Sequence, residues 1–175
     1  MRCEECGFDD TGLSPTEAVA ALRKFPRRYR APLTRLLPGE DGSVLRRRPE
    51  ASTWSALEYA AHVRDVFAAY ASRVRRTLDE DRPTFDDEPG PDEAAAAGRY
   101  NEQDPATVAD ELEANAELLA TTLEAVPADG WARVGVRHGE ERSVLLTARR
   151  AVHEGNHHLL DVGRSLRAGR DAARA

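Results

Sequence analysis

The sequence predicts an all-α protein built as a four-helix bundle, and three observations support this prediction. Apolar side chains recur every three or four residues over long segments, which is the period of one helix face. Helix-start signals precede several of these segments, each a capping residue followed by proline or by glutamate three positions on. Strand-like alternation is weak, and 175 residues with 41% hydrophobic side chains suit one domain with one core.

The first predicted helix opens at Ser14, where a proline follows at once and Glu17 completes a capping box. Large apolar residues continue at helical spacing as far as Leu36. Pro26 and Pro32 interrupt this pattern, so we expect a kink or a break at these prolines.

The second predicted helix starts near Ser55, with Glu58 as the partner in its capping box. Its apolar face runs from Tyr59 to Leu78. His62 lies within that face, three residues after Tyr59, so its side chain is expected to point inward.

Residues 79–104 are rich in proline, aspartate, glutamate and glycine, which predicts an acidic loop with a short helical turn, long enough to act as a lid. The third helix is expected to begin at the Asp104-Pro105 pair. After it, weak alternation from Trp131 and the turn residues that follow His138 indicate a small hairpin or an irregular turn.

The fourth predicted helix begins at about Ser143 and ends near Leu166. The expected organisation is therefore a Cys-x-x-Cys segment over residues 1–13, a bundle over 14–168 and a flexible tail over 169–175.

Charge and hydropathy narrow the class of function. The chain carries 31 acidic against 25 basic side chains, a net charge of −6, which disfavours nucleic acid as a partner because phosphate binding needs a surplus of arginine and lysine. It contains no apolar run of 18 residues, so no membrane association is expected. The polar first residues lack the apolar stretch of a signal peptide, and we expect a cytoplasmic protein.

The histidines carry the strongest chemical signal. His153 and His157 are four apart on the fourth helix, so their imidazoles lie on one side, one turn apart, close enough to share a metal ion such as zinc. His62 is the natural third ligand. Spacing alone leaves an alternative open, because His158 lies nearer to the main apolar stripe of that helix and could be the buried histidine instead.

The same segment contains His-Glu-x-x-His, the motif of zinc proteases, with Glu154 as the general base. Downstream of His157, the chain offers no glutamate as a third ligand, and the extended motif would need a histidine where Gly163 stands. Peptidase activity is therefore not expected. Glu154 is interpreted as support for a ligand or as an acid–base group, and Glu58 as a hydrogen-bond partner of His62.

Cys3 and Cys6 have the spacing of half a zinc knuckle. A second copy of the chain or His138 could complete four ligands. A labile disulfide and a pair of reduced thiols without function are the other interpretations.

Together these motifs resemble the DinB-like (YfiT-like) metal-binding superfamily, over roughly residues 22–164. The resemblance rests on a tryptophan–serine helix start followed by a histidine, and on a histidine-rich segment of the fourth helix. The residues are Trp54, Ser55 and His62, then His153, Glu154, His157, His158, Asp161 and Val162.

The resemblance implies a four-helix bundle of DinB/YfiT type that holds zinc or nickel on three histidines, carried over here as His62, His153 and His157. It further implies an enzyme that transfers a low-molecular-weight thiol, mycothiol in the actinobacterial branch, to an electrophilic small molecule. A metal-dependent hydrolase and a non-catalytic stress-related metal- or ligand-binding protein are the alternatives, and a homodimer is a further expectation. Arginines at the site entrance would hold the thiol cofactor, and the residues considered for this are Arg64, Arg99 and Arg142.

Overall fold

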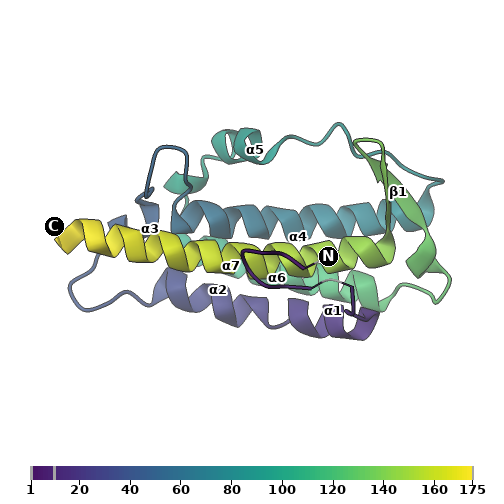
Figure 1. The fold of residues 1–175 in the computed structure, drawn as a ribbon, viewed down its shortest axis with the longest axis horizontal. Coiled ribbons are helices and arrows are strands. Elements are labelled where there is room, and N and C mark those ends of the chain that lie inside the picture. The colour runs from purple at the N-terminus through teal and green to yellow at the C-terminus, as the bar shows by residue number, and fades with distance from the viewer. Residues whose placement is uncertain (1, 10, 175) are drawn as a thin grey trace.

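The computed structural model describes residues 2–9 and 11–174 of the chain. Four long helical arms run side by side along its longest axis (Figure 1), which confirms the predicted all-α bundle. One arm is divided into two helices. The arms are α1 (Pro15–Leu22) with α2 (Phe25–Thr34), α4 (Ala56–Asp79), α6 (Pro105–Glu124) and α7 (Val144–Arg174).

Shorter elements connect these arms, and the predicted hairpin is among them. They are α3 (Ser43–Arg46), α5 (Pro91–Ala97), η1 (Tyr100–Glu102), η2 (Gly130–Ala132), β1 (Val134–Arg137) and β2 (Glu140–Ser143). The strands pair antiparallel, with Arg137 opposite Glu140. His138 and Gly139 form the turn between them with φ of 51° and 75°, the left-handed backbone that a tight two-residue hairpin requires.

The predicted helix starts are confirmed by their hydrogen bonds. Ser14 and Glu17 form a reciprocal capping box at α1, and Ser55 and Glu58 form another at α4. The Asp104 side chain accepts from the main chain of the first turn of α6. These caps fix where each arm begins and hence which residues face one another across the bundle.

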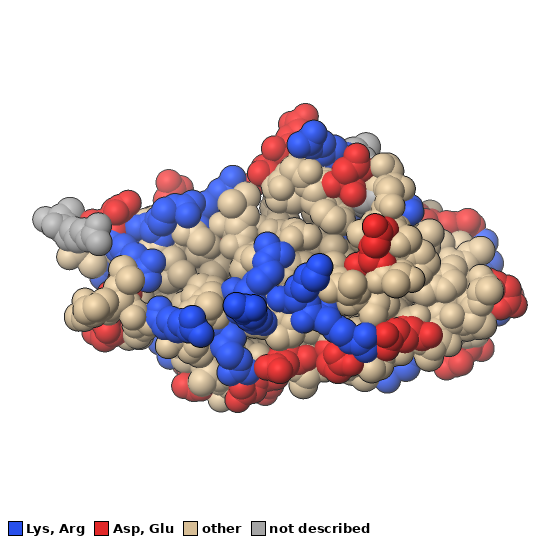
Figure 2. Space-filling model, turned by 90° about the horizontal axis from the view of Figure 1, so that it is seen from below, with Lys and Arg blue, Asp and Glu red and all other residues tan. Residues whose placement is uncertain are grey.

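The predicted break in the first arm lies between α1 and α2, where Pro26 occupies the first turn of α2. Pro32 lies inside α2, which ends two residues later. The face formed by α1 and α2 gathers basic side chains, with acidic ones beside them (Figure 2). Arg23 pairs with Glu117 at 2.9 Å, so part of this basic face fastens the divided arm to α6.

The fourth arm is longer than predicted, because α7 continues to Arg174 instead of ending near Leu166. The extra turns have partners: Arg47 donates to the carbonyl of Gly169 at 3.1 Å, and Arg170 pairs with Glu40 at 2.7 Å. The helix therefore crosses the domain boundary suggested at residue 168.

The N-terminal segment lies along α7 (Figure 1). Arg149 donates to the carbonyl of Leu13 at 2.9 Å, and the Phe8 ring stacks on the ring of His153 with centroids 5.8 Å apart. In the described part of the chain, no helix is both long and apolar enough to span a membrane.

Candidate metal centre

Helices α4 and α7 bring three metal-ligating side chains together on their facing sides. His62 comes from α4, and Glu154 and His158 come from consecutive turns of α7. One ligand atom from each lies within 4.8 Å of the others. The Glu154 carboxylate is 3.2 Å from Nε2 of His158 and 3.7 Å from Nε2 of His62.

This donor set fits a divalent ion. Nitrogen and oxygen ligands about 2.0–2.2 Å from a tetrahedral zinc ion lie about 3.3–3.6 Å from one another, close to the two distances above. Two histidines and a glutamate are also the ligand set of several catalytic zinc sites. Because three protein ligands do not fill a tetrahedral shell, such a centre keeps a coordination position for water or substrate.

The ring of His158 is held in the orientation that a metal ligand needs. Its Nδ1 lies 3.0 Å from the Asp161 carboxylate, which accepts a hydrogen bond and leaves Nε2 directed at Glu154. The Tyr59 ring stacks on the other side, with centroids 5.4 Å apart and planes 25° from parallel. A carboxylate behind a ligating histidine fixes its tautomer and raises its basicity.

The charges within the cluster attract one another strongly. Burial alone would lower the pKa of His158, but hydrogen bonds to Asp161 and Glu154 raise it to about 9. For the carboxyl group of Glu154, burial acts in the opposite direction and raises the pKa. Hydrogen bonds to His158 and His62 outweigh this effect and hold the pKa of Glu154 well below its usual range. A divalent ion bound here would replace the proton on His158, and the anionic oxygens of Glu154 and Asp161 would then offset the charge of the ion.

A pocket of about 650 Å³ opens in front of these three residues. Trp54 stands beside His62, with ring centroids 5.3 Å apart, and Val66 and Tyr70 extend the apolar wall. Side-chain exposures of 14% for His62 and 17% for His158 leave the ligands reachable from the pocket but largely shielded from bulk water.

Two arginines form the polar wall of this pocket. Arg73 pairs with Glu88 and lies 4.7 Å from the centre of the Tyr70 ring. Arg137 has a buried Nε without a hydrogen-bond partner. Burial and the nearby positive charge of Arg73 lower the pKa of Arg137. Both effects disfavour the charged form of this side chain, so an anionic ligand in the pocket would stabilise it.

The acidic loop over residues 79–104 covers one side of the pocket through Glu88, Pro89, Pro91 and Ala94. The loop is fastened at its start, where the amide of Phe85 donates to the carbonyl of Val136 at 3.0 Å. The predicted short helical turn is α5, drawn above α4 in Figure 1, and its Ala95 is buried in the core.

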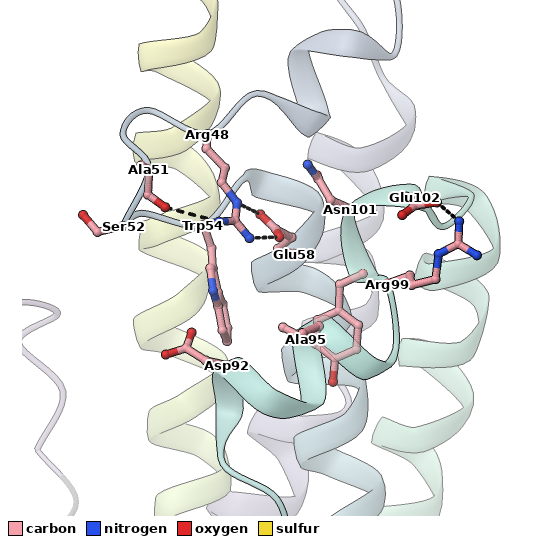
Figure 3. A pocket seen from close by; sticks show the side chains of 12 residues that line it. Arg48, Ala51, Ser52, Trp54, Glu58, Asp92, Ala95, Arg99, Asn101 and Glu102 are labelled. Atoms are coloured by element: carbon pink, nitrogen blue, oxygen red, sulfur yellow. Dashed lines mark hydrogen bonds and ion pairs between the residues drawn. The ribbon is translucent and has the colours of Figure 1, made fainter.

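A second pocket, of about 560 Å³, adjoins the first and shares Trp54 and Tyr100 with it. Figure 3 shows Arg48 paired there with Glu58. The carboxylate of Glu58 also accepts from the main chain of Ser55 at 2.9 Å. Glu58 therefore caps and anchors α4, and the expected hydrogen bond to His62 is replaced by these contacts.

The structure does not bring the three predicted ligands together. His62 lies with Glu154 and His158, whereas His153 and His157 lie with Cys3 and Cys6 in a separate cluster. The physical reason is the 100° turn per helical residue, which points positions 153 and 157 away from the side shared by 154 and 158. The alternative that placed His158 inward agrees with the observed arrangement.

The arginines expected at the entrance have other partners. Arg64 is buried and pairs with Asp65 and Glu111, and Arg99 pairs with Glu102. Arg142 pairs with Glu140 at 3.2 Å. The arginines at the pocket, Arg73 and Arg137, come from the far end of α4 and from the hairpin, and no motif in the sequence links these two positions.

The fold and this cluster define a helical-bundle protein with a candidate metal centre between two of its arms. The chain belongs to the DinB superfamily, whose family model matches residues 12–162. A comparison with curated proteins finds no match.

Among solved structures, the chain is similar to YfiT from Bacillus subtilis, a probable metal-dependent hydrolase with an unusual four-helix bundle topology. The TM-score is 0.78 at 13% sequence identity, over 90% of this chain and 88% of the other. At this identity the likeness establishes the YfiT-like fold.

Proposed function

We propose that this protein is a metal-dependent enzyme in which His62, Glu154 and His158 hold a divalent ion, with zinc the first choice and nickel the second. The observation that carries the proposal is the convergence of two imidazoles and one carboxylate at the wall of a pocket of about 650 Å³. When bound, the ion supplies a Lewis acid that lowers the pKa of a coordinated water or thiol.

The chain's own residues would bind and orient a small organic substrate. Trp54 and Val66 offer apolar surface beside the ligands, which excludes water from the reacting groups. Arg73 and Arg137 on the polar wall would hold an anionic group such as a carboxylate or phosphate. Asp161 keeps the ring of His158 in place.

Hydrolysis, with water as the nucleophile, is the reaction that this donor set supports best. The His₂Glu combination recurs in hydrolytic zinc enzymes. YfiT, which shares this fold, is a probable metal-dependent hydrolase. We therefore propose a hydrolase that acts on a small substrate with an anionic group.

Transfer of a low-molecular-weight thiol of the mycothiol type to an electrophilic molecule is the second candidate. The volume of the pocket lies well within the range of drug-sized ligand sites, which favours room for a polar thiol beside a small electrophile. The two arginines would then hold the polar part of the thiol. Both candidates use the same three ligands and differ only in the nucleophile.

The test measures metal content and activity of untagged protein. Anionic esters and amides are assayed without thiol, and an electrophile such as monobromobimane is assayed with added thiols. His62→Ala and His158→Ala should each lose the pocket metal and the activity, whereas Asp161→Asn should weaken metal affinity about 10–100-fold. His138→Asn, in the exposed hairpin turn, is the matched control and should behave as wild type.

The outcomes separate the candidates. Thiol-independent turnover that is lost with a chelator and restored by zinc or nickel supports the hydrolase, and turnover that requires a thiol supports the transferase. Full metal content and activity in both His62→Ala and His158→Ala would refute the proposed centre.

A further inference from the structure

A second group of metal-ligating side chains lies on another side of α7. Cys3 and Cys6 of the N-terminal segment meet His153 and His157, and one ligand atom from each lies within 4.8 Å of the others. All four residues are partly buried, and both cysteines are free thiols. Sulfur and imidazole nitrogen are the donors that structural zinc sites use most.

A tight turn of the main chain directs both cysteines towards the helix. The amide of Gly7 donates to the carbonyl of Cys3 at 2.9 Å, and the amide of Cys3 donates to the carbonyl of Phe8 at 2.8 Å. Gly7 has a φ of +70°, a backbone conformation that glycine adopts without strain. The Cys-x-x-Cys-Gly sequence is therefore folded into a loop that presents two thiols on one side.

The two histidines are held so that ring nitrogens face these thiols. Nδ1 of His157 lies 3.6 Å from Sγ of Cys3, while its Nε2 is 3.9 Å from Glu5 and 3.6 Å from Asp161. His153 is stacked on Phe8, and its Nε2 is buried without a hydrogen-bond partner. A buried nitrogen without a partner is costly unless a ligand satisfies it, and a ring nitrogen of His153 lies in the same cluster as both thiols.

We propose that Cys3, Cys6, His153 and His157 form a second, structural zinc site that fastens the N-terminal segment to α7. The pairs have the Cys-x₂-Cys and His-x₃-His spacings of Cys₂His₂ sites. Four protein ligands complete a tetrahedral shell and leave no position for substrate, so the site stabilises the fold and does not catalyse. This assignment is independent of the proposed function, because the ligands of the two sites are different residues.

The experiment counts metal ions in untagged, reduced protein reconstituted with zinc and freed of excess. Wild type should bind two ions per chain, and Cys3→Ser/Cys6→Ser should bind one. His153→Ala/His157→Ala should also bind one, which distinguishes a four-ligand site from metal held by the thiols alone. His62→Ala/His158→Ala should retain the structural ion, so failure of this site and failure of the pocket site give different results.

Cobalt substitution gives a spectroscopic readout of the thiolate ligands. Wild-type protein loaded with Co²⁺ should show the near-ultraviolet thiolate-to-cobalt charge-transfer band and the intense visible bands of a tetrahedral site, and the cysteine variant should lack the thiolate band. Zinc should also raise the melting temperature of wild type more than that of the cysteine variant, because the ion binds the folded state. Absence of the thiolate band in reduced wild type, or two bound ions in the cysteine variant, would overturn the proposal.

Discussion

A single methyl group added at Gly155 tests how tightly α7 is seated against the first arm. Gly155 directly follows Glu154 in α7 and lies over the ring of Phe25. A Cβ at this position would lie 2.6 Å from two ring carbons of Phe25. Carbon atoms in contact normally lie about 3.5–4.0 Å apart, so one of the partners would have to move by roughly 0.9 Å.

Phe25 has little freedom to move. It is 1% exposed and packs between Tyr29 and Phe67, with ring centroids 6.3 and 5.7 Å away. Overpacking in such a core costs about 1–3 kcal/mol, while replacing glycine by alanine inside a helix gains about 1 kcal/mol. Because the clash is with a rigid buried ring, we take the upper part of that cost, about 2–3 kcal/mol. Gly155→Ala should therefore lower the free energy of unfolding by about 1–2 kcal/mol net.

Urea denaturation followed by circular dichroism measures this change, with Gly163→Ala as the matched control. At Gly163 the nearest atom to an added Cβ is the end of the Arg167 side chain at 3.6 Å, so the same substitution in the same helix should stabilise by about 1 kcal/mol. Phe25→Leu should recover part of the loss in Gly155→Ala, since the two residues share one contact. Equal stabilisation by Gly155→Ala and Gly163→Ala would refute the packing argument.

Three further substitutions test the framework of the site. Tyr29→Phe removes a buried 2.8 Å hydrogen bond to a carbonyl of α7 and should cost about 1 kcal/mol in urea denaturation. Burial raises the pKa of Glu58, but the hydrogen bonds of this carboxylate, above all to Arg48, lower the pKa overall. The ionised Glu58 therefore stabilises the fold above the ordinary glutamate pKa of about 4.3. This stabilisation is lost as the pH falls through the lower pKa of the folded state. Glu58→Gln should therefore cost about 1–3 kcal/mol at neutral pH, and wild type and variant should converge in acid. Glu88→Gln frees the loop from Arg73, and hydrogen exchange in residues 86–99 should become about tenfold faster while the hairpin amides keep their rates.

The sequence is informative about the helices because their start signals are local. Ser14 with Glu17, and Ser55 with Glu58, specify cap and partner within four residues, and the structure contains both boxes. The end of α7 was not predictable in this way. Its last turns are stabilised by contacts such as Arg170 with Glu40, which lie 130 positions apart in the sequence.

The composition of the site was harder to predict than the fold. A run of His-Glu-x-x-His-His contains two pairs with a spacing of four, and choosing between them requires knowing how α7 is rotated about its axis. That rotation is fixed by tertiary contacts, such as Gly155 against Phe25, which no local pattern encodes. The resemblance to a three-histidine family favoured His153 and His157, whereas here a glutamate and His158 occupy the side of the helix that faces His62.

Both clusters use the same two turns of α7, and this shared segment predicts coupling between them. His157 and His158 are adjacent, and Asp161 lies near both rings, at 3.6 and 3.0 Å. Zinc held by the thiols and His157 would restrict the motion of these turns and so lower the entropy lost when the pocket ion binds.

We therefore expect the pocket site to bind zinc more weakly in Cys3→Ser/Cys6→Ser than in wild type, by about 5-fold or more, measured by competition with a chromophoric chelator. By linkage, loss of the pocket ion in His62→Ala/His158→Ala should weaken zinc binding by Cys3, Cys6, His153 and His157 by the same factor, although this site still holds its ion. Equal pocket affinities in wild type and the cysteine variant would mean that packing of α7 against α4 already orders Glu154 and His158, and that the two sites act independently.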